Sequence, residues 1–211
     1  MQNQYLPEGL LLTTAQNREA IASQAGLERA MAQGRILEAP AALCDSDMNL
    51  YVDLGNVRGY MPREEVAYCR AGEEVKQIAV ITRVGKPVCF KVIGMREERG
   101  MPTAILSRRA AQLECRTAFL ADLIPGDIIR AKVTHLEQFG AFVDIGCGIP
   151  SLLTVDCISV SRISHPADRF TVGEYIPVVI RSIDRENDRA ALRTILKAIQ
   201  FLKEDKTSIA V

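Results

Sequence analysis

The amino-acid sequence predicts an all-β protein with minor α content: two five-stranded antiparallel barrels, an N-terminal helix and a helical connector. Short alternating or β-branched runs, separated by turn residues, fill 36–106 and again 128–194. Local patterns also recur about 90 residues apart, since YVDLG at 51–55 corresponds to FVDIG at 142–146. The recurrence of a whole five-strand unit indicates two copies of one small barrel.

The N-terminal segment is expected to hold an arm and one helix. Residues 1–13 include Pro7 and Gly9 and are predicted to form a loosely ordered arm. Thr13 or Thr14 is predicted to cap a single helix that ends at Gly34. The apolar positions spaced for one side of this helix are Ala20, Ile21, Leu27 and Met31.

Each barrel is expected to contain five short strands. Those of the first are 36–44, 50–54, 58–61, 88–95 and 103–106, and those of the second are 128–136, 139–145, 150–155, 175–183 and 189–194. In both units the longest connection, 62–86 or 156–174, joins the third strand to the fourth, as in the OB-fold. Residues 108–123 lack Gly and Pro and are predicted to form the helical connector. The segment after Thr194 is expected to extend as one or two helical turns.

Composition limits the possible functions. Lys plus Arg equals Asp plus Glu at 26 each, so no bulk positive charge drives unselective binding to nucleic acid. The six cysteines form no CxxC pair and only two histidines are present, which favours scattered buried thiols in a reducing cytosol over a metal site. The N-terminus lacks signal-peptide features and no apolar run approaches a membrane span. We therefore expect a cytoplasmic protein with no metal, no cofactor and no membrane partner.

The candidate binding site centres on two aromatic residues, Phe139 and Phe142. Under strict alternation they face opposite sides of a strand, but a bulge at Gly140 would turn both outward. Exposed neighbouring rings form a platform on which nucleic-acid bases stack, each for roughly 1–3 kcal/mol. The alternative, that both rings fill the barrel core, is equally compatible with periodicity.

Basic residues accompany these aromatics. If Ile129, Ala131 and Val133 point inward, then Arg130, Lys132 and Thr134 point outward and His135 follows at the rim. Arg189 and Arg193 are expected outward on the last strand. No GxSxG, HExxH or GxxxxGK motif occurs, so an enzyme is not predicted. Asp53 and Asp144 each precede a turn glycine, which favours turn capping over paired catalytic acids.

Residues 126–194 resemble an S1 RNA-binding domain, an OB-fold module. The motifs that carry the resemblance are Gly126-Asp127, Val133-Thr134, FGAFVD at 139–144, Leu152-Leu153, Arg162 to Pro166, VGE at 172–174, and Ile183-Asp184 followed by Arg189 and Leu192. The resemblance implies a single-stranded RNA site that includes Phe139, Phe142, Thr154, Asp184 and Arg189, to which we add Lys132, His135 and Arg162. Thr154 stands where the family has a histidine, which weakens the expected affinity and base preference.

Residues 34–109 resemble a divergent copy of the same domain, similar to the N-terminal repeats of bacterial small-subunit ribosomal protein S1. Met48 and Tyr51 occupy the positions of the two phenylalanines, and Pro62 falls near the position of Thr154. The expected organisation is an arm and helix at 1–33, a divergent S1-type domain at 34–109, a connector at 110–125, an S1 RNA-binding domain at 126–195 and a tail at 196–211.

The function expected from these features is non-enzymatic binding of single-stranded RNA by the second domain, in translation on the small ribosomal subunit. Messenger RNA and the small ribosomal subunit are the partners that the resemblance implies. One alternative is a module that docks on a protein of the ribosome or RNA-processing machinery and has little RNA affinity of its own. Another is an accessory domain pair of a nuclease or polymerase whose catalytic part lies in a separate chain.

Overall fold

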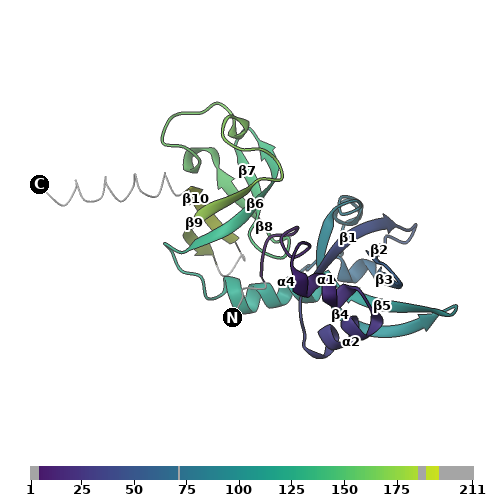
Figure 1. Cartoon of the computed structure of the whole chain (residues 1–211). Helices are drawn as coiled ribbons and strands as arrows, with labels where there is room; N and C mark the ends of the chain where they lie inside the picture. The colour runs from purple at the N-terminus through teal and green to yellow at the C-terminus, as the bar shows by residue number, and fades with distance from the viewer. Residues whose placement is uncertain (1–4, 71, 185–188, 195–211) are drawn as a thin grey trace, which may run out of the picture. The chain divides into compact units, whose positions relative to one another are not determined.

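The computed structural model describes residues 5–70, 72–184 and 189–194 (Figure 1). The chain divides into two compact units, Met1–Ala118 and Phe119–Val211. Each unit contains a closed five-stranded barrel, so the predicted fold class is confirmed. The helical turns predicted after Thr194 lie outside the described residues.

The first barrel has the strand order β1-β2-β3-β5-β4 and closes on itself. Its strands are β1 (Leu37–Cys44), β2 (Leu50–Leu54), β3 (Val57–Met61), β4 (Pro87–Glu98) and β5 (Met101–Ser107). The long connection after β3 carries a short 3₁₀ helix, η1 (Arg63–Glu65), and a short helix, α3 (Gln77–Ile81). The barrel interior is apolar, with Leu37, Leu50, Met61, Phe90 and Leu106 almost fully buried.

The second barrel repeats this order as β10-β8-β7-β6-β9. Its strands are β6 (Ile128–Glu137), β7 (Gly140–Asp144), β8 (Pro150–Thr154), β9 (Tyr175–Asp184) and β10 (Arg189–Thr194), with 3₁₀ helices η3 (Val155–Cys157) and η4 (Pro166–Asp168) after β8. In each barrel the third strand pairs in parallel with the fifth, whereas the other pairings are antiparallel. This parallel pairing closes the sheet, and closure leaves no free strand edge.

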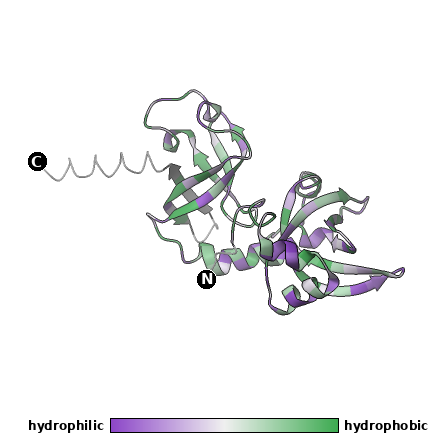
Figure 2. Cartoon of the chain, viewed as in Figure 1, coloured by the Kyte–Doolittle hydropathy of each residue, from purple (hydrophilic) through white to green (hydrophobic). Residues whose placement is uncertain are grey.

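Alternation of apolar and polar residues orients the strands as predicted (Figure 2). On β6, Ile129, Ala131 and Val133 are buried, whereas Arg130 and Thr134 are exposed. The second barrel is therefore packed inside and carries its polar side chains on the outer surface.

The prediction of one N-terminal helix is wrong, because the chain forms α1 (Ala15–Ile21) and α2 (Gln24–Ala32). The Ser23 side chain accepts a hydrogen bond from the Gly26 N–H and caps the second helix. A Cβ atom at Gly26 would lie 2.4 Å from the Ala20 carbonyl oxygen, so the two helices meet at a contact that only glycine permits. Met31, predicted on the apolar face, is exposed, and Ala30 is buried instead.

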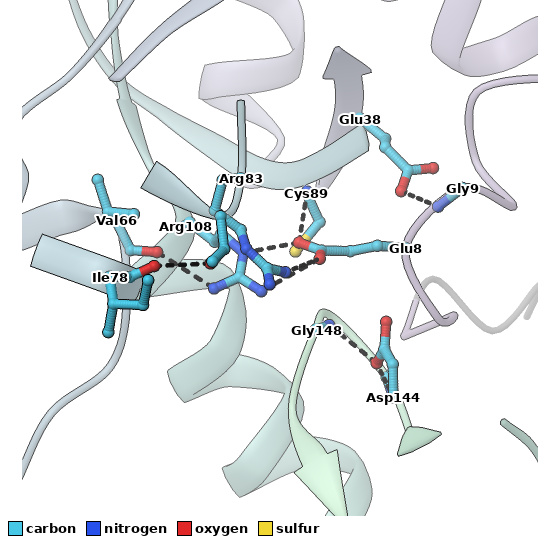
Figure 3. A network of polar contacts seen from close by, with 12 residues as sticks. Glu8, Gly9, Glu38, Val66, Ile78, Arg83, Cys89, Arg108, Asp144 and Gly148 are labelled. Carbon is cyan, nitrogen blue, oxygen red and sulfur yellow. Dashed lines mark hydrogen bonds and ion pairs between the residues drawn. The ribbon is translucent and has the colours of Figure 1, made fainter. Parts of the chain in front are cut away.

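The prediction of a loosely ordered arm at 1–13 is also wrong for its described residues, 5–13. The Glu8 carboxylate is buried and accepts hydrogen bonds from Arg108, at 2.6 Å from Nε and 3.1 Å from Nη2, and from the Cys89 N–H at 3.1 Å (Figure 3). Arg83 Nη1 lies 3.5 Å from the same carboxylate. Burial alone would raise the pKa of Glu8, but the charge and hydrogen bonds of Arg108 hold this pKa below its ordinary value.

A second buried carboxylate, Glu38, fixes the next residues of the arm. Its side chain accepts the backbone N–H groups of Gly9, Leu11 and Leu12. Burial, with a further contribution from the charge of Glu8, raises the pKa of Glu38 to about 7 in spite of these hydrogen bonds. The arm is thus an integral part of the first unit.

The predicted connector begins as α4 (Arg108–Cys115) and continues as one π-helical turn, Arg116–Leu120. The buried side of α4 packs against β4 and η1 of the first unit. Its first residue, Arg108, also donates to the Val66 carbonyl at 3.2 Å. The helix therefore links the arm, the long connection after β3 and the end of β5.

Candidate nucleic-acid interface

The aromatic face of the second barrel consists of His135, Phe139 and Phe142. The Phe139 and Phe142 ring centroids lie 6.0 Å apart at an interplanar angle of 88°, an edge-to-face contact. The His135 ring centroid is 6.3 Å from that of Phe142. Phe139 is 55% exposed and Phe142 is half-buried, so neither ring belongs to the barrel core.

The expected bulge at Gly140 is wrong, because β7 pairs with β8 without a register shift. Phe139 lies in the turn before β7, which frees its ring from strand alternation. The register shift is instead on β6, between Val133 and His135, and it sets His135 opposite Phe142. A bulge on the neighbouring strand thus assembles the aromatic face.

Gly140 has a different role, which is to let two strands approach closely. A Cβ atom at this position would lie 2.6 Å from the Leu153 carbonyl oxygen and 3.0 Å from Thr154 Cα. Because both contacts are with backbone, a side chain here would push β8 away from β7.

Hydrogen bonds hold the polar neighbours of the aromatic face. His135 Nε2 shares a 2.6 Å hydrogen bond with Glu137 Oε1, and the Thr134 hydroxyl donates to the Phe142 carbonyl at 3.1 Å. Thr154 ends β8 opposite Gly140 and is half-buried. A hydrogen bond from its side chain is the main cause that lowers the pKa of Asp156.

The other candidate residues lie on β6, in the connection after η3 and at the junction of β9 and β10. Lys132 is half-buried on the outer side of β6. Arg162 is exposed in the connection after η3, and among the described residues no contact joins it to the aromatic face. Asp184 and Arg189 are backbone partners at the junction of β9 and β10, and their side chains lie outside the described part of the chain.

Sequence reasoning missed one aromatic residue on the same barrel, Tyr175 at the start of β9. Arg130 Cζ lies 5.5 Å from the centre of its ring, and Lys132 Nζ lies 5.4 Å from it. The signal was present in the alternation of β9, where Ile176 and Val178 are buried and Tyr175 is not.

The recurring aspartates cap turns, as the sequence predicted. Asp144 Oδ1 accepts the N–H groups of Gly146 and Gly148 at 2.8 and 2.9 Å (Figure 3). Asp53 Oδ1 accepts the Gly55 N–H at 3.0 Å. In the part of the chain that the structure describes, no group of His, Cys, Asp and Glu has the arrangement of a metal site. Among the described helices, none is both long and apolar enough to cross a membrane.

The face of the first barrel that corresponds to the aromatic face is chemically different. Tyr51 and Tyr60 are cross-strand partners in an edge-to-face contact at 5.5 Å, and Arg96 Cζ lies 5.0 Å from the centre of the Tyr60 ring. Arg96 is paired with Glu98 at 2.5 Å, and the Tyr51 hydroxyl donates to Asp45 at 3.4 Å. Carboxylates therefore offset the positive charge on this face.

A closed five-stranded barrel with this strand order is an OB-fold, an architecture whose members include domains that bind oligonucleotides. Residues 122–195 match the family model described as "S1 RNA binding domain", so the second unit belongs to the S1 RNA-binding domain family.

About 70% of the chain is similar to bacterial ribosomal proteins. The chain is 33% identical over 155 residues to small ribosomal subunit protein bS1 of Mycobacterium tuberculosis (strain CDC 1551 / Oshkosh), covering 72% of this chain and 30% of the relative. It is 33% identical over 147 residues to bS1 of Staphylococcus aureus (strain N315), covering 68% and 35%. The chain thus spans about a third of the length of these relatives.

Among solved structures, the solution structure of GSP13 from Bacillus subtilis has a TM-score of 0.34 and 23% sequence identity. That similarity covers 37% of this chain and 59% of GSP13.

Proposed function

We propose that this protein binds single-stranded RNA through the aromatic face of its second barrel and acts, without catalysis, in translation on the small ribosomal subunit. The observation that carries the proposal is the contact of Phe139 with Phe142, with His135 alongside, on an S1-family barrel. The similarity to small ribosomal subunit protein bS1 supports the link to the ribosome.

The aromatic face suits binding without strong sequence selectivity. Every base has a π-face, so stacking tolerates different sequences and contributes roughly 1–3 kcal/mol per base. Two stacked bases, together with a few backbone contacts, are expected to give a dissociation constant in the micromolar range. This corresponds to a binding free energy of about −8 kcal/mol. Because the chain has no net charge, few phosphates are neutralised and the dependence of affinity on salt is expected to be shallow.

The test is a titration of labelled single-stranded RNA with ring-deletion variants. Each stacked base is taken to contribute roughly 1.4 kcal/mol. Phe139→Ala is therefore expected to weaken binding about tenfold, and the double variant that also carries Phe142→Ala is expected to weaken it about a hundredfold. Val172→Ala is the matched control, since Val172 is 57% exposed, close to the 55% of Phe139, and lies in a loop of the same barrel. Unchanged affinity of a folded Phe139→Ala protein would refute the stacking role.

A second candidate function is docking of the first barrel on a protein partner. This function is favoured by the ion pair of Arg96 with Glu98 beside the Tyr51–Tyr60 contact. Because Glu98 neutralises the charge of Arg96, this surface is poorly suited to bind a polyanion such as RNA. A ribosomal pull-down that survives nuclease treatment and is lost with Tyr60→Ala would support docking. Loss of the interaction on nuclease treatment would exclude it.

A further inference from the structure

A second cluster on the second barrel, Arg130, Lys132 and Tyr175, lies next to the aromatic face and is not part of it. Arg130 and Lys132 are two residues apart on β6 and share its outer side. Lys132 is the cross-strand partner of Tyr175 on β9, and both cations lie within 5.5 Å of the centre of the Tyr175 ring. We refer to these three residues as the cationic clamp.

The tyrosine ring explains why two positive charges are held together here. Like charges that share one face of a strand repel each other. A cation close to an aromatic face is attracted by the negative potential of the ring, and Tyr175 provides this attraction to both side chains. The ring therefore keeps a guanidinium and an ammonium group at one place on the surface.

Two carboxylates beside the clamp, Asp144 and Glu174, accept hydrogen bonds from the backbone. Asp144, the strand partner of Lys132, is 4% exposed and caps the turn through Gly146 and Gly148. Glu174 accepts the Thr171 N–H at 3.0 Å. In the described part of the chain, no carboxylate forms an ion pair with the exposed Arg130. The guanidinium group of Arg130 thus presents positive charge to solvent.

We propose that the cationic clamp is a phosphate-binding subsite that holds the backbone of the RNA whose bases stack on the aromatic face. This inference rests on the proposed function. Both sites lie on β6, where His135 follows Lys132 by three residues, about 10 Å along a strand. A guanidinium and an ammonium group suit a phosphate, because they donate several charge-assisted hydrogen bonds to its oxygens.

The experiment measures the dependence of affinity on salt concentration with the full chain and a labelled oligouridylate of about 12 nucleotides. For single strands, each neutralised phosphate contributes about −0.7 to the slope of log K against log salt. Because the two cations hold one phosphate, Arg130→Gln with Lys132→Gln is expected to make the slope shallower by about 0.7. Arg29→Gln, which removes an exposed arginine from α2 of the first unit, is the matched control and leaves the slope unchanged.

A second probe, the same oligonucleotide with an uncharged methylphosphonate backbone, separates phosphate contacts from stacking. The Arg130→Gln and Lys132→Gln changes should not alter its affinity, whereas Phe139→Ala should still weaken it about tenfold. Tyr175→Leu, which keeps both charges but removes the ring, is expected to weaken binding of the RNA about threefold. That effect should likewise be absent with the methylphosphonate probe.

The outcomes distinguish the two proposals. If the wild-type protein binds neither probe, the proposed function itself fails. A second outcome refutes only the phosphate subsite. In that case Phe139→Ala weakens RNA binding, but the double variant with Arg130→Gln and Lys132→Gln has the same salt slope as the Arg29→Gln control. A shallower slope, with unchanged affinity for the methylphosphonate probe, supports the clamp.

Discussion

Replacing Glu8 with Gln tests whether the N-terminal arm stabilises the first barrel. Gln keeps the size of the side chain and an oxygen that accepts the Cys89 N–H, but it removes the negative charge. Arg108 is 4% exposed and then loses the carboxylate that neutralises it. The change therefore isolates the charge of a buried ion pair.

The expected loss follows from this burial. Removing one partner of a buried pair costs about 3–5 kcal/mol, because a charge remains in a poorly solvated place. Arg83 adds little, since its side chain is 27% exposed and a partly solvated pair contributes about 0–1 kcal/mol. We expect the free energy of unfolding of the first unit to fall by about 3–4 kcal/mol.

The buried cysteines allow each unit to be measured separately. Cys89 and Cys115 are buried in the first unit, and Cys147 and Cys157 in the second. A buried thiol is labelled only when its unit unfolds, and labelling can be quantified by peptide mass spectrometry. Cys89 should therefore be labelled about 10² to 10³ times faster in the Glu8→Gln protein than in the wild-type protein.

Two comparisons serve as controls for this measurement. Cys147 should react at the wild-type rate. Glu28→Gln, an exposed substitution on α2, is expected to change stability by no more than about 0.5 kcal/mol. If Glu8→Gln accelerates Cys89 labelling no more than Glu28→Gln does, the buried pair has no net stabilising effect and the reasoning is refuted.

Three further predictions concern single positions. Gly140→Ala should destabilise the second unit by about 1–3 kcal/mol, because its Cβ would meet the backbone of β8. Gly94→Ala in the first unit should have little effect on urea unfolding, because its Cβ would lie at an ordinary contact distance of 3.7 Å from Ile105. Because the pKa of Glu38 is raised to about 7, the protonated side chain stabilises the folded state fully below about pH 4.5, and this stabilisation is lost as the pH rises through 7. The free energy of unfolding of the first unit should therefore be roughly 2 kcal/mol lower at about pH 8 than at about pH 5. Glu38→Gln should remove this difference, and a wild-type protein without it would contradict the assignment. Thr154→His should strengthen RNA binding about threefold in a titration, since it adds a ring beside the aromatic face, and weaker binding would oppose that placement.

The strands were predictable because alternation and turn residues are local signals. The second and last predicted strands, 50–54 and 189–194, agree with β2 and β10 at both ends, and the others differ by a few residues at most. The repeat also predicted two copies of one five-stranded barrel, and the structure adds that both barrels are closed. Phe139 and Phe142 were identified from one strand pattern, although their exposure comes from a turn and from the bulge on β6.

The features that sequence reasoning missed depend on contacts between distant positions. Glu8 and Arg108 are 100 residues apart, and nothing near either residue indicates the other. The break between α1 and α2 requires knowing that Gly26 will meet the Ala20 carbonyl. Tyr175 becomes informative only when β9 is set beside β6, because its cationic neighbours lie on another strand.

The pairing of Glu8 with Arg108 also has a consequence for synthesis of the chain. Translation adds about 5–20 residues per second, so Arg108 is made roughly 5–20 s after Glu8. Throughout that interval the arm lacks its buried partner. The first unit is therefore expected to acquire its full stability only after α4 has left the ribosome, and a nascent chain stalled after β5 should remain sensitive to protease.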